Sequence, residues 1–274
     1  MELISQNTKD IIGLDEIKEK LNEKQVITAY WGIEPNGEPS LEILIPLMKL
    51  RDLIKSNISC TVFLADVHSF LNKGCNLMER TEDKTTYYKH LITVVFSYIG
   101  IYPIDFEFIR GSDIQLDKKY IIDLYKFTSY LTINQAKSSS AFIIKNNEDP
   151  LVSSLIYPMM QILDETVLGT DIQIGNINQC PIYNIARKYA EQMGYKKSSY
   201  LIYNNIPNLN IKYIELNIKN KKNKKVDTIS VVINDECFIY FTDDIETITD
   251  KINNATCIEG VIDLNKAPCL ALAK

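Results

Sequence analysis

One helix-length segment carries three polar side chains at spacings that bring them together. In the string YPMMQILD, Tyr157 and Gln161 are four residues apart and Asp164 follows three residues later, so all three lie on one face of a helix. A phenol, an amide and a carboxylate side by side could hydrogen-bond a polar small molecule. Each of these residues alone is more typical of a core or surface side chain whose hydrogen bonds are made within the protein. The hypothesis of a binding site therefore needs further polar residues nearby.

The sequence offers little for metal or zinc chemistry. The six cysteines never form a CxxC pair, and no histidine is close enough in sequence to complete a zinc knuckle. His68 and His90 are the only histidines, which excludes a His-rich metal centre. We therefore expect no bound metal.

Composition and charge describe an ordinary globular chain. It has 274 residues, 46% hydrophobic and 24% charged, with a formal net charge of -5. This charge provides no global basic field for non-specific nucleic-acid binding, and we interpret the Lys-rich segment 217–228 as a solvated hairpin tip rather than an RNA-binding patch. The first ten residues resemble no signal peptide, and no apolar run approaches the roughly 20 residues of a membrane span. We expect a reduced, soluble, cytoplasmic protein that does not bind membranes.

The elements that must position these residues alternate between helices and strands. Apolar periodicity predicts helices at 13–24, 41–57 (interrupted by Pro46), 83–99, 116–132, 151–167, 181–193 and 243–255. Short β-branched runs predict strands at 26–32, 59–68 and about 105–109, and a hairpin from 213–218 and 228–241. Strands separated by helices indicate a parallel sheet wrapped by helices, with ligands at the carboxyl ends of the strands. Here those ends are the loops after Tyr30 and Asp66.

Several strings in this order resemble the catalytic domain of tyrosyl-tRNA synthetases of the archaeal and eukaryotic cytosolic type, which are class I synthetases. They are AYWGIEPNG (29–37), FLADVHSFLN (63–72), RGSDIQLDKKY (110–120), DLYKFTSYLT (123–132), DPLVSSLIYPMMQILDE (149–165), IARKYAEQMGYKK (185–197) and DKINNATCIEG (250–260). The resemblance implies an α/β fold with a Rossmann-like parallel sheet, a helical connective insertion at about 110–160, and a small C-terminal hairpin and helix remnant. We expect a catalytic-type domain over 1–207 and a divergent segment over 208–274, without an anticodon-binding domain.

The resemblance also implies a pocket for L-tyrosine or a tyrosine-like molecule. In that family a Tyr and an Asp hold the substrate phenol, and here these positions are Tyr30 and Asp164. The residues that hold the ammonium group correspond to Tyr157, Gln161 and Gln179. Three further residues fall at pocket positions of the family, namely Ala65, His68 and Gln115.

The nucleotide-binding positions depart from the family's pattern. The HIGH-like tetrad reads Ser40-Leu41-Glu42-Ile43, so Ser40 replaces a histidine and Glu42 replaces the glycine against which adenine lies. A carboxylate at that place would overlap the purine and would repel the negatively charged polyphosphate. No KMSKS-like loop follows Pro207-Asn208-Leu209, and Asn178 replaces the Asp that meets the ribose.

We therefore expect a non-catalytic tyrosine-binding paralogue without cofactors. One alternative is a divergent, active tyrosine-tRNA ligase or related aminoacyl transferase, and only this reading requires ATP and Mg²⁺. A second alternative is an interaction protein in which the pocket residues only pack the core and bind no ligand. The resemblance further implies a homodimer formed through the insertion, while tRNA binding is doubtful. The apolar residues expected at the dimer interface are Phe127, Tyr130, Phe142, Ile143 and Ile144.

Overall fold

The computed structural model describes residues 1–72, 78–144, 149–206, 209, 211–216, 227–232 and 238–256. The chain forms two compact units. The first contains Met1–Gly37 and Leu44–Asn204, and the second contains Glu38–Ile43 and Asn205–Lys274. We expected the boundary at residue 207 alone; the units divide after Asn204, and the short segment Glu38–Ile43 clusters with the second unit.

A six-stranded sheet forms the centre of the first unit, in the order β1-β6-β5-β2-β3-β4. β1 runs antiparallel to β6, and the other neighbouring strands are parallel, as in the class I synthetase fold that we predicted. The strands span Asp10–Ile12 (β1), Thr28–Ile33 (β2), Ser59–Leu64 (β3), Phe106–Arg110 (β4), Ile172–Asn176 (β5) and Ser199–Tyr203 (β6). Continuous apolar runs such as those of β2 and β3 suit strands that helices cover on both faces.

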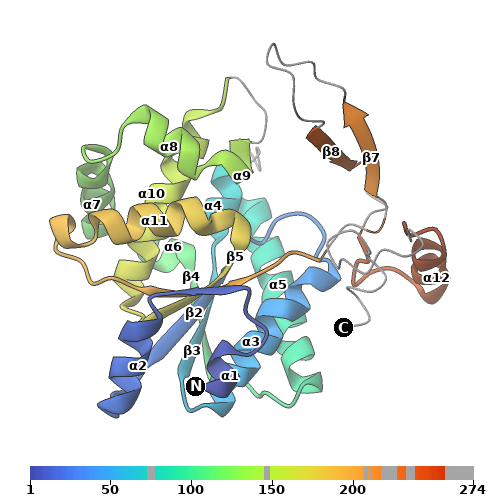
Figure 1. Cartoon of the computed structure of the whole chain (residues 1–274), viewed down its shortest axis with the longest axis horizontal. Coiled ribbons are helices and arrows are strands. Elements are labelled where there is room, and N and C mark those ends of the chain that lie inside the picture. The colour runs from blue at the N-terminus through green and yellow to red at the C-terminus, as the bar shows by residue number, and fades with distance from the viewer. Residues whose placement is uncertain are drawn as a thin grey trace. The chain divides into compact units, whose positions relative to one another are not determined.

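Helices cover both faces of this sheet. Figure 1 shows α7, α8, α10 and α11 on one side and α1 and α3 on the other. The α-helices of this unit are Glu2–Ser5 (α1), Leu14–Asn22 (α2), Leu44–Lys55 (α3), Asp66–Leu71 (α4), Met78–Tyr98 (α5), Gly111–Gln115 (α6), Lys118–Thr128 (α7), Ile133–Ser139 (α8), Ala141–Ile144 (α9), Val152–Leu168 (α10) and Cys180–Tyr189 (α11). Short 3₁₀ helices span Ile177–Gln179 (η2) and Glu191–Met193 (η3).

Most predicted helices are present with shifted ends. The helix predicted at 41–57 begins at Leu44, because Leu41–Ile43 form the 3₁₀ helix η1. The helix predicted at 116–132 is the shorter α7, in which the Asp117 side chain caps the first turn by accepting from the Lys119 backbone amide at 2.7 Å. Among the described residues, no helix is long and apolar enough to cross a membrane.

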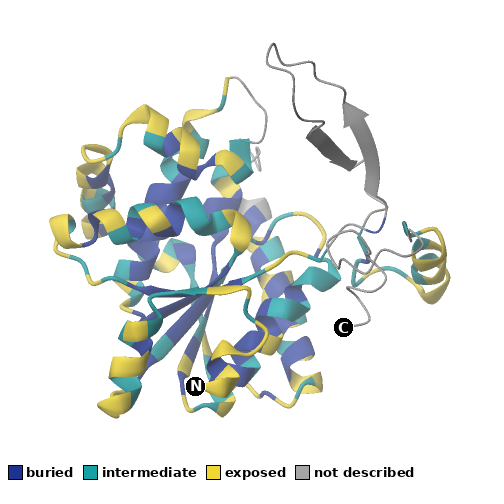
Figure 2. Ribbon diagram, in the orientation of Figure 1, coloured by how far each residue is buried: buried dark blue, intermediate teal, exposed yellow. Residues whose placement is uncertain are grey.

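The core on the α10 side contains aromatic residues packed against the sheet. Tyr183 and Tyr200 are fully buried, and their rings stack with centroids 4.2 Å apart. Phe127 is also fully buried in this cluster, so the prediction that it lies at a dimer interface is wrong. Figure 2 shows the central strands β2 and β3 largely in the colour of buried residues.

The second unit contains the predicted hairpin and the predicted C-terminal helix. β7 (Ile211–Leu216) pairs antiparallel with β8 (Asp227–Val232), and α12 (Ile245–Asn253) begins at Asp244, whose side chain accepts from the Thr247 amide at 2.7 Å. β8 ends at Val232, before the predicted end at 241. The Lys-rich tip at 219–225 lies outside the described residues.

We expect Gly175→Ala to lower the free energy of unfolding by about 1–3 kcal/mol, the usual cost of overpacking a core. A Cβ at Gly175 would overlap the Tyr183 hydroxyl and lie 2.5 Å from its Cζ, and Tyr183 is held in place by its stack on Tyr200. Urea-induced unfolding measures the change.

Gly32→Ala is the matched control, because its Cβ would meet Phe63 and Tyr30 at 3.7 Å, an ordinary contact. Adding Tyr183→Phe to Gly175→Ala should recover part of the lost stability, since the overlapping hydroxyl is removed. If Gly175→Ala were as stable as Gly32→Ala, the tight packing of Tyr183 would be refuted.

Candidate functional site

A pocket opens at the carboxyl ends of β2 and β3, where parallel α/β sheets commonly bind ligands. All the predicted pocket residues except Gln115 line it. The lining residues are Tyr30, Gly32, Glu34, Phe63, Ala65, His68, Tyr157, Gln161, Asp164, Gln173 and Gln179. The helix face predicted from YPMMQILD therefore faces a cavity rather than a closed core.

Asp164 on α10 is the centre of a buried hydrogen-bond network and is only 2% exposed. Its carboxylate lies 2.8 Å from Nε2 of His68 and accepts from Nε2 of Gln115 at 2.8 and 3.0 Å. The Tyr120 hydroxyl donates to the same carboxylate at 2.8 Å. Gln115 thus supports the cavity from behind. We did not predict Tyr120, because the periodicity of its helix does not reveal that its hydroxyl reaches Asp164.

Several polar atoms at the cavity lack a hydrogen-bond partner among the described residues. They are the hydroxyl of Tyr30, Nδ1 of His68 and the Oε1 atoms of Gln161 and Gln173. Burial raises the pKa of the Tyr30 phenol well above its usual value, so this hydroxyl is protonated and available as a donor. Unpaired buried polar groups are rare and costly. Their concentration at one cavity is what a site for a polar ligand would show.

Glu34 adds a carboxyl group to the rim, and we did not predict it. It follows β2 and accepts from the side-chain amides of Asn36 and Asn72 at 3.0 Å and from the Tyr157 hydroxyl at 3.3 Å. Burial raises its pKa, although these hydrogen bonds oppose the shift. Its place directly after the first parallel strand was the signal that could have identified it.

Gln173 is the second unpredicted residue of the cavity. It lies on β5 beside Tyr30 of β2 and is 3% exposed. A polar residue within the apolar run of a buried strand was the available signal, since such a side chain must find a partner or a ligand.

Gln179 is held by two donors. Its Oε1 accepts from the Asn176 backbone amide at 3.0 Å and from the Tyr183 hydroxyl at 2.8 Å. The first of these bonds closes a capping box at the start of η2.

The predicted nucleotide positions have local partners of their own. Ser40 forms an antiparallel bridge with Tyr240, in which the Leu41 amide donates to the Ile239 carbonyl at 2.9 Å. Burial raises the pKa of Glu42, although a backbone hydrogen bond from Ile206 lowers it. The Asn178 amide donates to Oδ1 of Asn176 at 2.9 Å.

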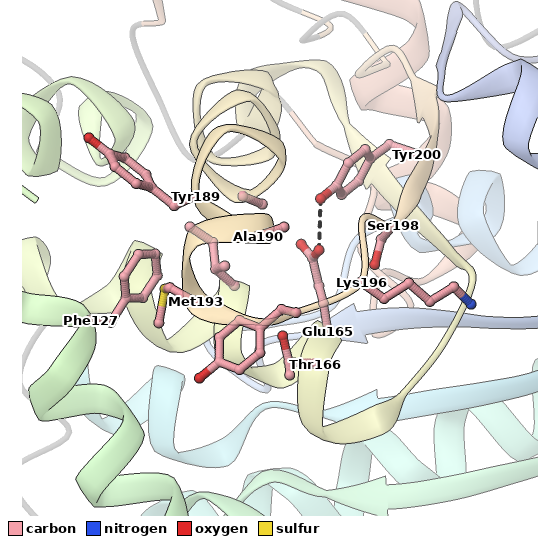
Figure 3. Close-up of a pocket in the computed structure, with 12 residues that line it drawn as sticks. Phe127, Glu165, Thr166, Tyr189, Ala190, Met193, Lys196, Ser198 and Tyr200 are labelled. Carbon is pink, nitrogen blue, oxygen red and sulfur yellow. Dashed lines mark hydrogen bonds between the residues drawn. The ribbon is translucent and has the colours of Figure 1, made fainter. Parts of the chain in front are cut away.

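A second cavity, of about 270 Å³, has Glu165 as its buried acid. Figure 3 shows the Tyr200 hydroxyl pointing at the Glu165 carboxyl, to which it donates at 2.7 Å. Burial raises the pKa of Glu165 to about 8. The aromatic residues of its wall are Phe127, Tyr189, Tyr195 and Tyr200.

Comparison with known proteins identifies the class of molecule that has this fold and site. A family described as tRNA synthetases class I (W and Y) matches residues 22–269. The chain belongs to this family, and within it the chain is a tyrosyl-tRNA synthetase-like protein.

Tyrosine–tRNA ligases are among the proteins similar to this chain. The chain is 32% identical to the cytoplasmic enzyme of Gallus gallus over 264 residues, which are 96% of this chain and 47% of that protein. It is also 32% identical to the probable cytoplasmic enzyme of Encephalitozoon cuniculi, covering 94% of this chain and 72% of that protein. The chain therefore spans about half the length of the Gallus gallus relative. The structure of the Archaeoglobus fulgidus tyrosyl-tRNA synthetase complexed with L-tyrosine superposes with a TM-score of 0.82 at 29% identity, covering 99% of this chain and 78% of that chain.

We expect the Glu165 carboxyl to make stability fall with rising pH. The folded chain keeps this proton up to a pH of about 8, whereas the unfolded chain releases it near 4.5. Between these values the folded state binds more protons, so the free energy of unfolding falls by up to about 1.4 kcal/mol per pH unit. Glu165→Gln should remove this contribution to the slope.

Urea unfolding at several pH values between 5 and 8 measures the slope. Glu191→Gln, a change at an exposed carboxylate, is the control and should keep the wild-type slope. Equal slopes for wild type and Glu165→Gln would contradict the assignment.

Proposed function

We propose that this chain binds L-tyrosine, or a tyrosine-like small molecule, in the cavity at the ends of β2 and β3. The observation that carries the proposal is the unpaired, buried hydroxyl of Tyr30 in the same cavity as the Asp164 carboxylate. A ligand phenol would accept from Tyr30 and donate to Asp164, whose carboxyl group lines the same cavity. The Archaeoglobus fulgidus relative, solved with L-tyrosine, supports this ligand.

The ammonium group of the ligand belongs near Gln161 and Tyr157. The unpaired Oε1 of Gln161 can accept from an ammonium. Tyr157 lies one helical turn before Gln161 on α10, and its hydroxyl donates to Glu34. Glu34 thereby supplies a carboxyl group at the end of the cavity where a cation would be favoured.

We further propose that the chain does not activate tyrosine with ATP. The residues at the nucleotide positions do not fit the nucleotide: Glu42 carries a side chain and an acid where the family has glycine, and Ser40 cannot replace a histidine on phosphate. Phosphoryl and adenylyl chemistry depends on preorganised cations and backbone donors. The Leu41 amide already donates to the Ile239 carbonyl, so this amide is not available to a phosphate. ATP and Mg²⁺ are accordingly not part of the proposed function.

Tyr30→Phe should weaken L-tyrosine binding by a factor of about 5–150, the cost of leaving one buried partner unsatisfied. Binding of L-phenylalanine should not weaken, so the variant loses discrimination between the two. Because the Tyr30 hydroxyl has no partner among the described residues, the variant should be at least as stable as wild type, which separates a binding defect from a folding defect. Calorimetry measures both affinities.

Asp164→Ala should have the same effect on discrimination, although it also removes the acceptor of three donors. Phe70→Ala, at a half-exposed residue outside the cavity lining, is the control. Equal affinity of the wild-type chain for tyrosine and phenylalanine would contradict the proposal.

Tyrosine-dependent pyrophosphate exchange should stay at background. Losing a single preorganised electrostatic group typically costs a factor of about 10²–10³ in rate, and here several positions differ together. Exchange above background would instead identify a divergent, active ligase. If it disappeared on neutralising Lys219, Lys221, Lys222, Lys224 and Lys225, the Lys-rich segment would be its source of positive charge. Absence of both exchange and tyrosine binding would favour an interaction protein.

We expect a homodimer, formed through the exposed apolar residues of the segment 110–160. With Phe127 buried, the available residues on α7 are Ile122 and Tyr125, the latter 68% exposed. Sedimentation should give twice the chain mass of 31.4 kDa, and Tyr125→Lys should shift it toward the monomer. Tyr98→Lys, on α5 outside the segment and 86% exposed, should not. A monomer at every concentration would refute this assembly.

A further inference from the structure

The second cavity contains a buried acid whose hydrogen bonding is incomplete. Glu165 on α10 is 5% exposed, and one of its carboxyl oxygens accepts from the Tyr200 hydroxyl at 2.7 Å. The other oxygen, Oε1, has no hydrogen-bond partner among the described residues. Figure 3 shows this carboxyl group among the side chains that line the cavity. Because a buried polar atom without a partner is costly, an occupant of the cavity that donates to Oε1 would be stabilised there.

The cationic side chain of the cavity wall is directed elsewhere. Lys196 lines the cavity, but it forms an ion pair with Asp171. Figure 3 shows the Lys196 amino group pointing away from the Glu165 carboxyl. The positive charge of this lysine therefore does not neutralise Glu165.

The size of the cavity and the chemistry of its wall define what could bind. The volume of about 270 Å³ includes space open to solvent, and the part that the centre of a water-sized molecule can reach is about 10 Å³, which is room for one such occupant. The hydroxyls of Thr166 and Ser198 in the wall can accept hydrogen bonds. Aromatic rings attract cations, and four line this cavity, namely Phe127, Tyr189, Tyr195 and Tyr200. A small group with a positive charge and several N–H donors matches such a wall.

We propose that this cavity binds an ammonium-type cation, either the free ammonium ion or the –NH₃⁺ head of a small primary amine, which donates to Oε1 of Glu165. The cation replaces the carboxyl proton, which leaves to the solvent, so the net charge of the cavity does not change. The site shares no lining residue with the proposed tyrosine site. It therefore does not depend on tyrosine binding.

Competition with the proton makes binding depend on pH. Burial raises the pKa of Glu165 to about 8, so the empty cavity holds a protonated acid at neutral pH. The titratable groups that line the cavity or interact with Glu165 are Asp164, Tyr30, Tyr183, Tyr189, Tyr195, Lys196 and Tyr200. Burial raises the pKa of the Tyr30, Tyr183 and Tyr200 phenols, which stay protonated. A proton displaced by the cation below pH 8 therefore comes from Glu165.

Urea unfolding of the full chain in different salts of equal ionic strength tests the site. At a pH of about 8, ammonium chloride should raise the free energy of unfolding above its value in sodium chloride, because the cation binds only the folded state. Choline is too large for the cavity and should behave as sodium does. Since one proton leaves for each cation bound, the apparent affinity for ammonium should fall about tenfold for each pH unit below 8.

Methylammonium chloride distinguishes the two sources of the ligand. A gain as large as that from ammonium would assign the site to amine head groups, whereas a gain from ammonium alone would assign it to the free ion.

Glu165→Gln keeps an acceptor for the Tyr200 hydroxyl but cannot carry a negative charge, so the stabilisation by ammonium should be lost. Glu191→Gln, at an exposed carboxylate, is the control and should retain it. A measurement on the wild-type chain covers the case in which Glu165→Gln fails to fold. Carbon-13 NMR of the Glu165 carboxyl should give a titration midpoint near 8 in sodium chloride and a lower midpoint in ammonium chloride.

Three results would overturn the inference. Equal stability in ammonium and sodium chloride at pH 8, with an unchanged Glu165 midpoint, would mean that the cavity holds only water beside a neutral acid. The same gain in Glu165→Gln as in wild type would show that ammonium acts at another place. A gain from choline equal to that from ammonium would show a general effect of the salt.

Discussion

Burial of the Asp164 carboxylate is the constraint on which the arrangement of the first unit depends. A carboxylate at 2% exposure is tolerated only if hydrogen-bond donors replace its water. Those donors come from α4, α6 and α7, through His68, Gln115 and Tyr120. Each helix must therefore be docked against α10 before the carboxylate is satisfied. The same network leaves one side of Asp164 facing the cavity, where a ligand hydroxyl would complete it.

α10 contributes residues to both of the cavities described above. Asp164 lines one and Glu165, the next residue, lines the other. Their environments differ in the number of donors: Asp164 has three side-chain donors, whereas one oxygen of Glu165 has no partner among the described residues. Burial accordingly raises the pKa of Glu165 to about 8. Two adjacent acids thus have different surroundings: Asp164 lines the proposed ligand site, whereas Glu165 accepts from Tyr200.

The sequence predicted those features of the fold and the site that depend on local periodicity. The alternation of strands and helices identified the parallel sheet, and the spacing of Tyr157, Gln161 and Asp164 identified the helix face that lines the cavity. It did not predict Tyr120 or Gln173, because their roles depend on which elements pack together. The prediction that Phe127 lies at a dimer interface was wrong, because an apolar helix face can pack against either the chain's own core or a second copy. The nucleotide positions were assigned only through the family resemblance, as were Tyr30, Ala65, His68, Gln115 and Gln179 in the pocket.

We propose that the chain binds tyrosine and does not activate it with ATP. Calorimetric titration of L-tyrosine into the wild-type chain, with and without ATP and Mg²⁺, tests it most directly. We expect one site per chain, with the same affinity and the same heat of binding in both conditions. Absence of binding, or a heat of reaction accompanied by pyrophosphate release when ATP is present, would contradict it.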